Sequence, residues 1–354
     1  MPPEPAGPPD RLDPLARPLV DALTAAFPDL GGTVTDAVEA RRILAAAPAA
    51  PAAPAAPAAP ASPASTKTPP AVGAVTDRTI PGPPGAPDIP VRVYLPHPDA
   101  HQHPHPRPTV VFFHGGGYTL CGLDSHDATV RGLAARSGAV VVSVGYRLAP
   151  EHRFPAAVDD AYAALCWAAG ESAALGGDPG ALVTAGDSSG GGLAAAVTLR
   201  ARDAGGPAVA LQVLLYPVLD AAQDTVSYRE NADGYFLTAA HMRWFWEQYL
   251  GPDGDGTHPL ASPLRAADLT GLPPAHLLTA GCDPLRDEGL AYAERLRAAG
   301  VEVTPAHYPH MFHGFLGFPD VLPDAAKALQ EAAEAIESAA GGRKNSGVDG
   351  GGAG

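Results

Sequence analysis

The serine-centred run GDSSG, residues 186–190, is the part of the sequence that most directly predicts chemistry. It matches the pattern G-x-S-x-G with Ser188 at its centre, and the apolar run ALVTA precedes it while the small-residue run GGLAAAVTL follows. A strand, a sharp turn and a helix are therefore expected, which is the setting of a nucleophilic serine. Glycines flank the serine because a Cβ would clash in so tight a turn. The alternative is a Gly-Ser loop in which Ser188 or Ser189 merely caps the helix.

A second run, HGGGY at residues 114–118, follows the apolar run TVVFF. Acyl transfer creates an oxyanion, and backbone N–H groups are its usual donors. Three glycines, Gly115, Gly116 and Gly117, let the chain present N–H groups to a cavity with no side chain in the way. A glycine run alone is more often a flexible turn at a strand end, but its position upstream of a G-x-S-x-G run favours an oxyanion hole.

A serine hydroxyl needs a base to take its proton, and a carboxylate to orient that base. In the α/β-hydrolase arrangement the chain order is serine, acid, histidine. Asp283 follows the apolar run AHLLTA and His313 follows VEVTPAHY, so both are expected at carboxyl ends of strands, where α/β sheets bind ligands. Asp287 would lie about a turn into the next helix, so Asp283 is better placed, although it could also cap that helix. His310 is three residues from His313, and the sequence barely separates the two.

Short apolar runs alternate with helix-length segments from about residue 75 onward. This alternation predicts an α/β fold with a mostly parallel sheet covered by helices on both faces, although the first runs are close enough to be antiparallel. The expected strands are 91–96, 109–115, 139–146, 181–189, 211–217, 275–281 and 301–308, and two of the expected helices are 154–169 and 190–204.

The first part of the chain has a different pattern of apolar residues and prolines. Apolar residues at helical spacing, among them Leu15 and Val38, predict two short amphipathic helices within residues 12–44, separated by Pro28 and a glycine pair. They are too small to form a core alone. Prolines at nearly every third position of 48–64 then predict a semi-rigid, polyproline-like linker.

Composition excludes several classes of function. The 354 residues include 23 Lys and Arg against 38 Asp and Glu, a net charge of −15, so binding to nucleic acid or to anionic lipid by charge is not expected. No signal peptide, membrane span or C-x-x-C pair is visible, and a cytoplasmic location is expected. Histidines 97, 101, 103 and 105 have spacings that could bind a metal, but residues between prolines lack a fixed geometry, so no metal site is expected.

Six runs in this order together resemble one family. They are HGGGY, YRLAPEHRFPAAVDDA (146–161), GDSSGG, YPVLD (216–220), DPLRDEG (283–289) and HGF (313–315). From about Val91 to about Ile336 the chain resembles the bacterial hormone-sensitive-lipase-like (family IV) esterases of the α/β-hydrolase superfamily. The resemblance implies Ser188 as nucleophile, Asp283 as acid and His313 as base. It also implies an oxyanion hole from the N–H groups of Gly116, Gly117 and Ser189, with Gly115 supporting the turn.

The resemblance further implies a helical cap over an α/β-hydrolase core. The expected division is cap helices at 1–47, the Pro/Ala-rich linker at 48–72, a catalytic domain at 73–340 with a cap insertion at about 221–252, and a disordered tail at 341–354. Tyr118 and the aromatic residues Phe236, Trp244 and Trp246 are candidates for the substrate pocket, and ordinary core packing is the alternative.

The expected function is a serine carboxylesterase that hydrolyses small, short-acyl esters through an acyl-enzyme and needs no cofactor. An amidase or lactonase with the same triad is an alternative that the sequence leaves open. A non-catalytic small-molecule receptor on the same fold is another alternative, but the presence of His313 in its HGF run weighs against it. A homodimer is also left open.

Overall fold

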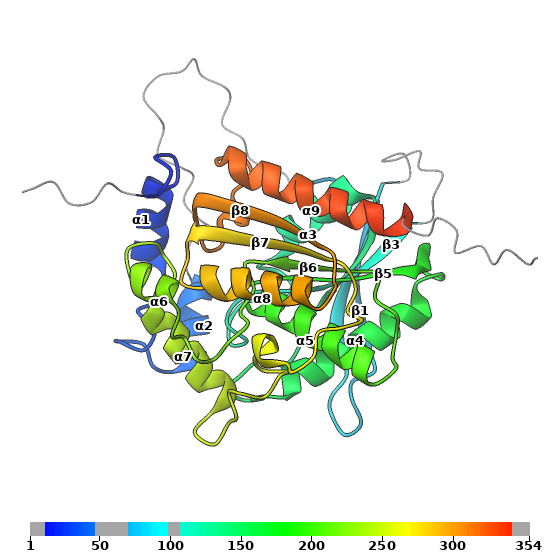
Figure 1. Ribbon diagram of the computed structural model, residues 1–354, viewed down its shortest axis with the longest axis horizontal. Helices are drawn as coiled ribbons and strands as arrows, with labels where there is room; N and C mark the ends of the chain where they lie inside the picture. The colour runs from blue at the N-terminus through cyan, green and yellow to red at the C-terminus, as the bar shows by residue number, and fades with distance from the viewer. Residues whose placement is uncertain (1–10, 47–69, 98–106, 342–354) are drawn as a thin grey trace, which may run out of the picture.

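The computed structural model describes residues 11–46, 70–97 and 107–341 (Figure 1). The Pro/Ala tract, the tail beyond residue 341, and histidines 101, 103 and 105 lie outside these ranges. The predicted linker, the predicted disorder of the tail and the question of a metal on the histidine-rich run therefore remain predictions.

Eight strands of the described chain form one sheet in the order β1-β2-β4-β3-β5-β6-β7-β8. The first two pairs, β1 with β2 and β2 with β4, are antiparallel, and every other neighbouring pair is parallel. The predicted fold class, a mostly parallel α/β-hydrolase sheet, is confirmed. The strands are β1 Ala74–Ile80, β2 Ile89–Leu95, β3 Arg107–Phe113, β4 Val140–Val144, β5 Gly177–Asp187, β6 Leu211–Leu215, β7 Ala275–Cys282 and β8 Val303–Phe312.

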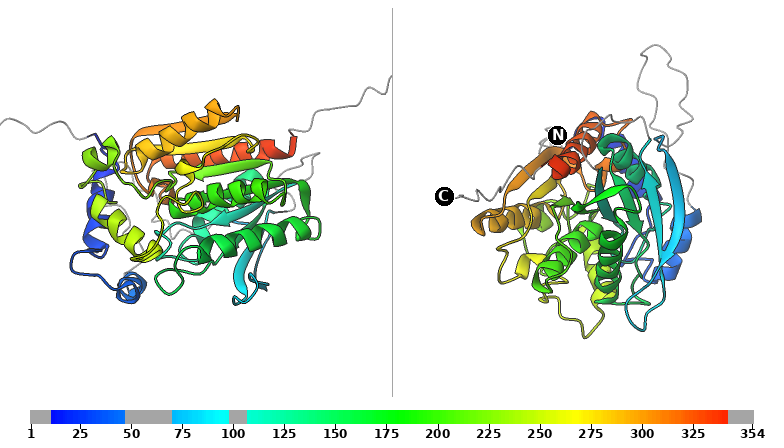
Figure 2. Two further views of the ribbon diagram at one scale, coloured as in Figure 1. Left: turned by 60° about the horizontal axis from the view of Figure 1, so that its bottom comes forward. Right: turned by 90° about the vertical axis from the view of Figure 1, so that its right-hand side faces the viewer.

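Helices cover both faces of the sheet (Figures 1 and 2). Helices α3 and α9 pack on one face, and α4, α5 and α8 pack on the other. The helices are α1 Arg17–Ala26, α2 Ala37–Ala46, α3 Asp127–Ser137, α4 Ala156–Glu171, α5 Ser189–Asp203, α6 Val226–Glu230, α7 Ala239–Leu250, α8 Arg286–Ala298 and α9 Pro323–Gly341, with short 3₁₀ turns at Pro263–Arg265 and Phe315–Gly317.

The central strands are mostly apolar and buried because both faces of the sheet are covered. In β3, Val110 and Phe112 pack into the core beside α3 and α9, whereas Val111 and Phe113 pack into the core on the other face. Strand β1 was not predicted. Its residues are mostly exposed and Ile80 alone is buried, so this edge strand has no apolar run to mark it.

The N-terminal helices α1 and α2 lie beside α6 and α7, which come from the insertion at about 221–252 (Figures 1 and 2). The Nε1 atom of Trp244 in α7 donates to the carbonyl of Thr35, just before α2, at 3.0 Å, so the two groups of helices are tied together. Two details of the helical prediction were wrong. Leu15 and Val38 are 54% and 59% exposed, because α1 begins only at Arg17 and Val38 points away from the core.

Candidate active site

Ser188 lies on the turn between β5 and α5. Its backbone has φ +56° and ψ −122°, a strained conformation that presents the side chain at the end of the strand. Glycine is required beside it: a Cβ on Gly190 would lie 1.9 Å from the carbonyl oxygen of Phe113, and one on Gly186 would lie 2.3 Å from the carbonyl oxygen of Gly190. The Ser188 N–H donates to the carbonyl of Leu215 in the neighbouring strand at 2.9 Å, which fixes the turn on the sheet.

Asp283 and His313 follow β7 and β8, and the structure brings both side chains to Ser188. The Nε2 atom of His313 lies 2.9 Å from the Ser188 hydroxyl oxygen, and its Nδ1 atom lies 2.8 Å from Oδ2 of Asp283. The other Asp283 oxygen accepts the N–H of Leu285 at 2.9 Å, so this carboxylate also caps the start of α8. All three side chains are buried, and this arrangement can pass a proton from the serine to the imidazole.

The two competing residues face elsewhere. The Nδ1 atom of His310 lies 2.9 Å from the carbonyl of Arg11, on the surface. The carboxylate of Asp287 accepts the N–H of Ser227 at 2.7 Å and pairs with Arg286 at 2.7 Å. The geometry therefore favours Asp283 and His313.

The role of Asn231 was not predicted from the sequence. Its buried side-chain amide donates to the carbonyl of Asp283 at 2.9 Å and to that of Gly281 at 3.2 Å, so a residue of the cap insertion holds the segment that carries the acid. Nothing in its local sequence signals this contact, because it is made only in the folded chain.

The glycine run forms a loop next to Ser188. The N–H of Gly115 donates to Oδ1 of Asp187 at 3.0 Å, so Gly115 supports the loop and its N–H is already engaged. Among the described residues, the N–H groups of Gly116, Gly117 and Ser189 have no acceptor. These three donors are therefore free for an oxyanion.

A partly buried histidine–aspartate pair, which the sequence does not reveal, lies next to this loop. The Nε2 atom of His126 is 3.2 Å from Oδ1 of Asp187. Burial lowers the pKa of His126, but the charge and hydrogen bond of Asp187 outweigh burial and raise it above its ordinary value. Burial likewise raises the pKa of Asp187, but His126 outweighs it and the pKa of that carboxyl lies below its usual range. Burial, with His126 nearby, lowers the pKa of His114 to about 4, so His114 is neutral at pH 7.

Of the four candidate pocket residues, Tyr118 belongs to the glycine run, whereas Phe236, Trp244 and Trp246 lie in or next to α7. Tyr118 stacks on Tyr249 with ring centroids 3.8 Å apart, and Trp246 lies 6.1 Å from the Tyr118 ring. Phe236 packs edge-on to Phe27 of the N-terminal segment. Trp244, as described above, binds the Thr35 carbonyl.

Phe245 is an aromatic residue that the sequence reasoning did not single out. A Cβ on Gly117 would lie 2.1 Å from Cδ1 of Phe245, so this ring of α7 lies directly over the glycine run. The sequence does not distinguish it from its neighbours Trp244 and Trp246, because the rotation of the helix determines which residue faces the loop.

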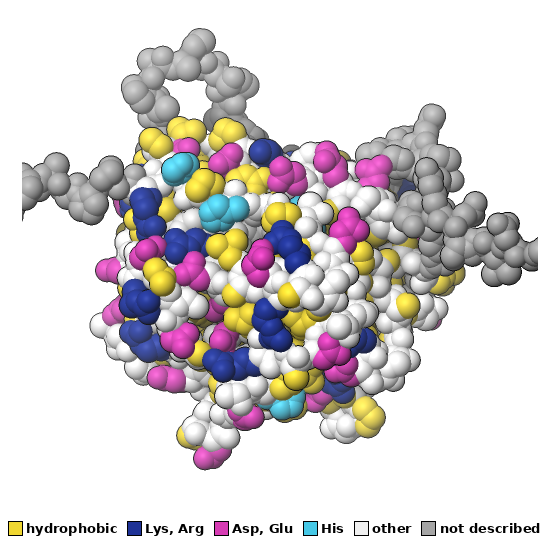
Figure 3. Space-filling model, in the orientation of Figure 1, with side chains coloured by type: hydrophobic (Ala, Val, Ile, Leu, Met, Phe, Trp, Pro, Cys, Tyr) yellow, Lys and Arg dark blue, Asp and Glu magenta, His cyan; other side chains and the backbone are white. Residues whose placement is uncertain are grey.

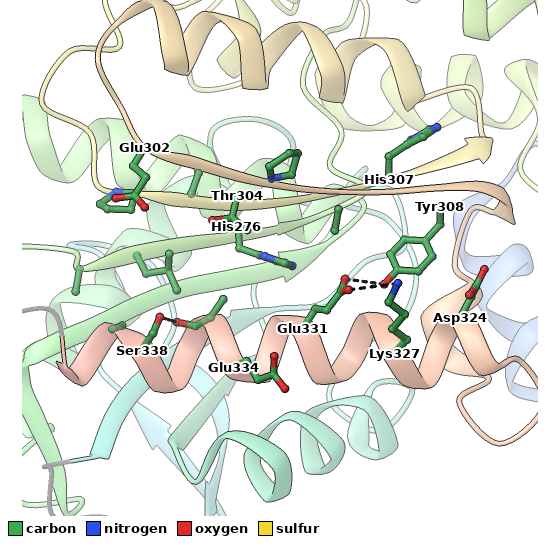
Figure 4. Close-up of a pocket in the computed structure, with 18 of the residues that line it drawn as sticks. His276, Glu302, Thr304, His307, Tyr308, Asp324, Lys327, Glu331, Glu334 and Ser338 are labelled. Carbon is green, nitrogen blue, oxygen red and sulfur yellow. Dashed lines mark hydrogen bonds and ion pairs between the residues drawn. The ribbon is translucent and has the colours of Figure 1, made fainter.

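A separate cavity of about 1030 Å³ lies between β8 and α9 (Figure 4). It is lined by His276, Tyr308 and Glu331, among others, and the Tyr308 hydroxyl donates to Glu331 at 2.7 Å. The lining residues do not include Ser188, Asp283 or His313. This cavity is therefore distinct from the candidate active site.

Basic and acidic side chains are interspersed on the face of the molecule that Figure 3 shows, and no continuous basic patch covers it. Among the described residues, no helix is long and apolar enough to cross a membrane. The same part of the chain contains no group of three or more His, Cys, Asp or Glu side chains arranged to hold a metal ion.

The sheet order, the turn that carries Ser188 and the order of serine, aspartate and histidine along the chain define the α/β-hydrolase class. The profile of the α/β hydrolase fold family matches residues 110–317. A curated relative, the carboxylesterase NlhH of Mycobacterium tuberculosis, is 44% identical over 268 residues, which are 75% of this chain and 82% of the relative. An ethyl acetate hydrolase of Pseudomonas putida is 39% identical over 252 residues, 70% of this chain and 78% of that one.

Solved structures of similar proteins have the same fold. An α/β hydrolase from a Lake Arreo metagenome superposes with a TM-score of 0.80 at 38% identity, over 93% of this chain and 98% of that chain. The chain belongs to the α/β-hydrolase fold family, in its hormone-sensitive-lipase-like branch.

Proposed function

We propose that the protein is a serine carboxylesterase in which Ser188 is the nucleophile, His313 the general base and Asp283 the acid of the triad. The observation that carries the proposal is the continuous hydrogen-bonded chain from the Ser188 hydroxyl through His313 to Asp283, with distances of 2.9 and 2.8 Å. Relatives named as carboxylesterases, at 44% identity, support hydrolysis of carboxylic esters.

In the first half-reaction, the Ser188 oxygen attacks the ester carbonyl carbon while Nε2 of His313 takes the hydroxyl proton. Asp283 holds Nδ1 protonated and stabilises the imidazolium. The tetrahedral intermediate collapses when His313 gives the proton to the leaving alcohol, which leaves an acyl group on Ser188. In the second half-reaction a water attacks the acyl carbon, with His313 again as base, and the carboxylic acid departs.

The oxyanion of both intermediates binds the N–H groups of Gly116, Gly117 and Ser189. These donors lie in a buried region and need no rearrangement to meet the charge. Loss of one such donor typically costs about 2.7–4 kcal/mol of transition-state stabilisation. No cofactor takes part in these steps.

Residues 1–47 and about 221–252 form the cap, and residues 73–340 form the catalytic domain around that insertion. The substrates are small, short-acyl esters. This is supported by the relative named for ethyl acetate, and we propose that Tyr118, Phe236, Trp244 and Trp246 contribute apolar surface to the substrate pocket. A cytoplasmic location fits the three cysteines, Cys121, Cys166 and Cys282, none of which forms a disulfide.

The test is hydrolysis of p-nitrophenyl esters of increasing acyl length by the purified chain and by Ser188→Ala. The proposal expects turnover that favours short chains and is lost in the variant. Comparable rates for the two proteins would refute the role of Ser188, and no turnover by either would favour a receptor. A matched anilide and a lactone, assayed in parallel, decide between an esterase and the amidase or lactonase alternatives.

A further inference from the structure

We propose that the cap positions the oxyanion loop through Arg41, so that docking of the N-terminal helices controls the chemical step and not only access to the site. This inference rests on the proposed function. It concerns the loop 116–120, which carries two of the three oxyanion donors.

The loop is largely buried, so its carbonyl groups need hydrogen-bond donors that hold the backbone in place. The carbonyl of Gly116 accepts the N–H groups of Thr119 and Leu120, at 3.1 and 2.8 Å. The carbonyl of Gly117 accepts the Thr119 hydroxyl at 3.0 Å, and the carbonyl of Tyr118 accepts the N–H of Ala149 at 2.9 Å. The loop itself thus satisfies the carbonyl groups of Gly116 and Gly117, and Ala149 satisfies that of Tyr118.

The next carbonyl, that of Thr119, is bound by the cap. The Nε atom of Arg41 in α2 donates to it at 2.8 Å. The same guanidinium donates to the carbonyl of Ala149 at 2.6 Å and forms a two-pronged pair with Glu151, with both distances 2.8 Å. One side chain of the cap therefore joins the oxyanion loop to the segment that supports it.

The guanidinium is well suited to this role because its fixed fork reaches several acceptors at once, which a lysine ammonium cannot do with the same geometry. The Arg41 side chain is 29% exposed, so water screens these contacts only in part. The hydrogen bonds from Arg41, the largest contribution, lower the pKa of Glu151 to about 2, so the pair remains ionised over the range in which the enzyme can work.

The second half of the cap contacts the same loop. The Phe245 ring fills the space beside Gly117, and Trp244 ties α7 to Thr35 just ahead of α2. Arg41 and Phe245 therefore hold the loop at two points. Displacement of reacting groups by about 1 Å can cost on the order of 100-fold in rate, so even a slightly looser loop should be visible in kcat.

The experiment compares Arg41→Ala and Arg41→Lys with Arg42→Ala. Arg42 lies on the same helix and, among the described residues, pairs with Glu39 alone on the surface, so the control removes an equal charge without touching the loop. For each protein we would measure kcat and KM with a short p-nitrophenyl ester and the inhibition constant of a trifluoromethyl ketone. Ser188 adds to that ketone to give an oxyanion, so its affinity reports on the oxyanion hole. Circular dichroism establishes the temperature at which all variants are folded.

We expect Arg41→Ala to lower kcat by about 10- to 100-fold with little change in KM. The affinity for the trifluoromethyl ketone should fall by a similar factor. Added methylguanidinium should restore part of the lost kcat. The kcat of Arg41→Lys should lie between those of Arg41→Ala and the wild type, and the kcat of Arg42→Ala should match that of the wild type. A kcat equal to that of Arg42→Ala, or a rise in KM alone, would overturn the inference. If Arg41→Ala does not fold, Arg41→Lys decides by the same criteria. Absence of turnover by the wild type would instead be a failure of the proposed function.

Discussion

The imidazole of His313 lies 2.9 Å from the hydroxyl oxygen of Ser188, although 125 residues separate the two along the chain. Two different strand ends bring them together, since Ser188 follows β5 and His313 follows β8. The site thus depends on the register of the whole sheet. The histidine and the aspartate of the triad can each be tested against a residue of the same type, nearby in the sequence, whose side chain faces elsewhere.

The first test uses the two histidines of the run PHMFH. Because His313 alone reaches Ser188, His313→Ala should lower kcat by about 10³-fold or more. His310→Ala loses only a surface contact with the Arg11 carbonyl and should keep close to the wild-type rate. Steady-state hydrolysis of a short p-nitrophenyl ester measures both. The reverse pattern would move the base to His310.

The second test concerns the acid. Asp283→Asn keeps the shape of the side chain but cannot stabilise the imidazolium, so kcat should fall by on the order of 10⁴-fold. Asp287→Asn should keep most of the activity and instead lower the free energy of unfolding by about 1–3 kcal/mol, because its bonds to Ser227 and Arg286 are weakened. Urea unfolding and steady-state rates separate the two effects. A larger loss of kcat in the Asp287 variant would contradict the assignment.

The third test is of the space beside the oxyanion loop. Gly117 has φ +59°, and a Cβ there would meet the Phe245 ring, so Gly117→Ala should shift the loop and lower kcat by about 10- to 100-fold. Gly122→Ala is the matched control, because a Cβ on Gly122 meets nothing within 4 Å. If the two variants have equal rates, the loop is not confined as the structure shows.

The fourth test concerns the pair of His126 and Asp187 and measures how the stability of the protein depends on pH. The pKa of His126 is raised in the folded protein because Asp187 outweighs the effect of burial. Its contribution to stability is therefore complete below about pH 6.5, the ordinary histidine pKa, and is lost as the pH rises through the folded value. The pKa of Asp187 is lowered, so its contribution is present above about pH 4 and is lost as the pH falls through the folded value.

Urea unfolding of the wild type and of His126→Gln, from below pH 4 to well above pH 6.5, checks this prediction. The wild type should lose stability on the alkaline side, and the variant should show a smaller loss there. An equal alkaline loss in both proteins would show that another group titrates.

The sheet and the triad were predictable for one physical reason. Strands buried on both faces are mostly apolar, so they are visible in the sequence, and ligand-binding residues follow their carboxyl ends. The strand end favours Asp283, whereas only the family resemblance separates His313 from His310. The structure brings Asp283 and His313 to Ser188. Strand β1 escaped prediction because it lies at an exposed edge, where no apolar run is needed.

The supporting groups could not be predicted because their roles arise from tertiary contacts. His126 lies 61 residues from Asp187, and Arg41 lies 78 residues from the Thr119 carbonyl that it binds. Phe245 faces the glycine run because of the rotation of α7, and no local pattern distinguishes it from Trp244 or Trp246. Each of these contacts joins segments that are far apart in the sequence, so it becomes visible only in the folded chain.

The central claim, that Ser188 is the nucleophile, is tested most directly by covalent labelling with a p-nitrophenyl alkylphosphonate. Mass spectrometry of the intact chain and of its peptides would follow the label. The account predicts one phosphonyl group per chain, located on Ser188, with activity lost in proportion to labelling and no label on Ser188→Ala. A label on a different residue that abolishes activity, or full activity in a chain labelled on Ser188, would contradict it.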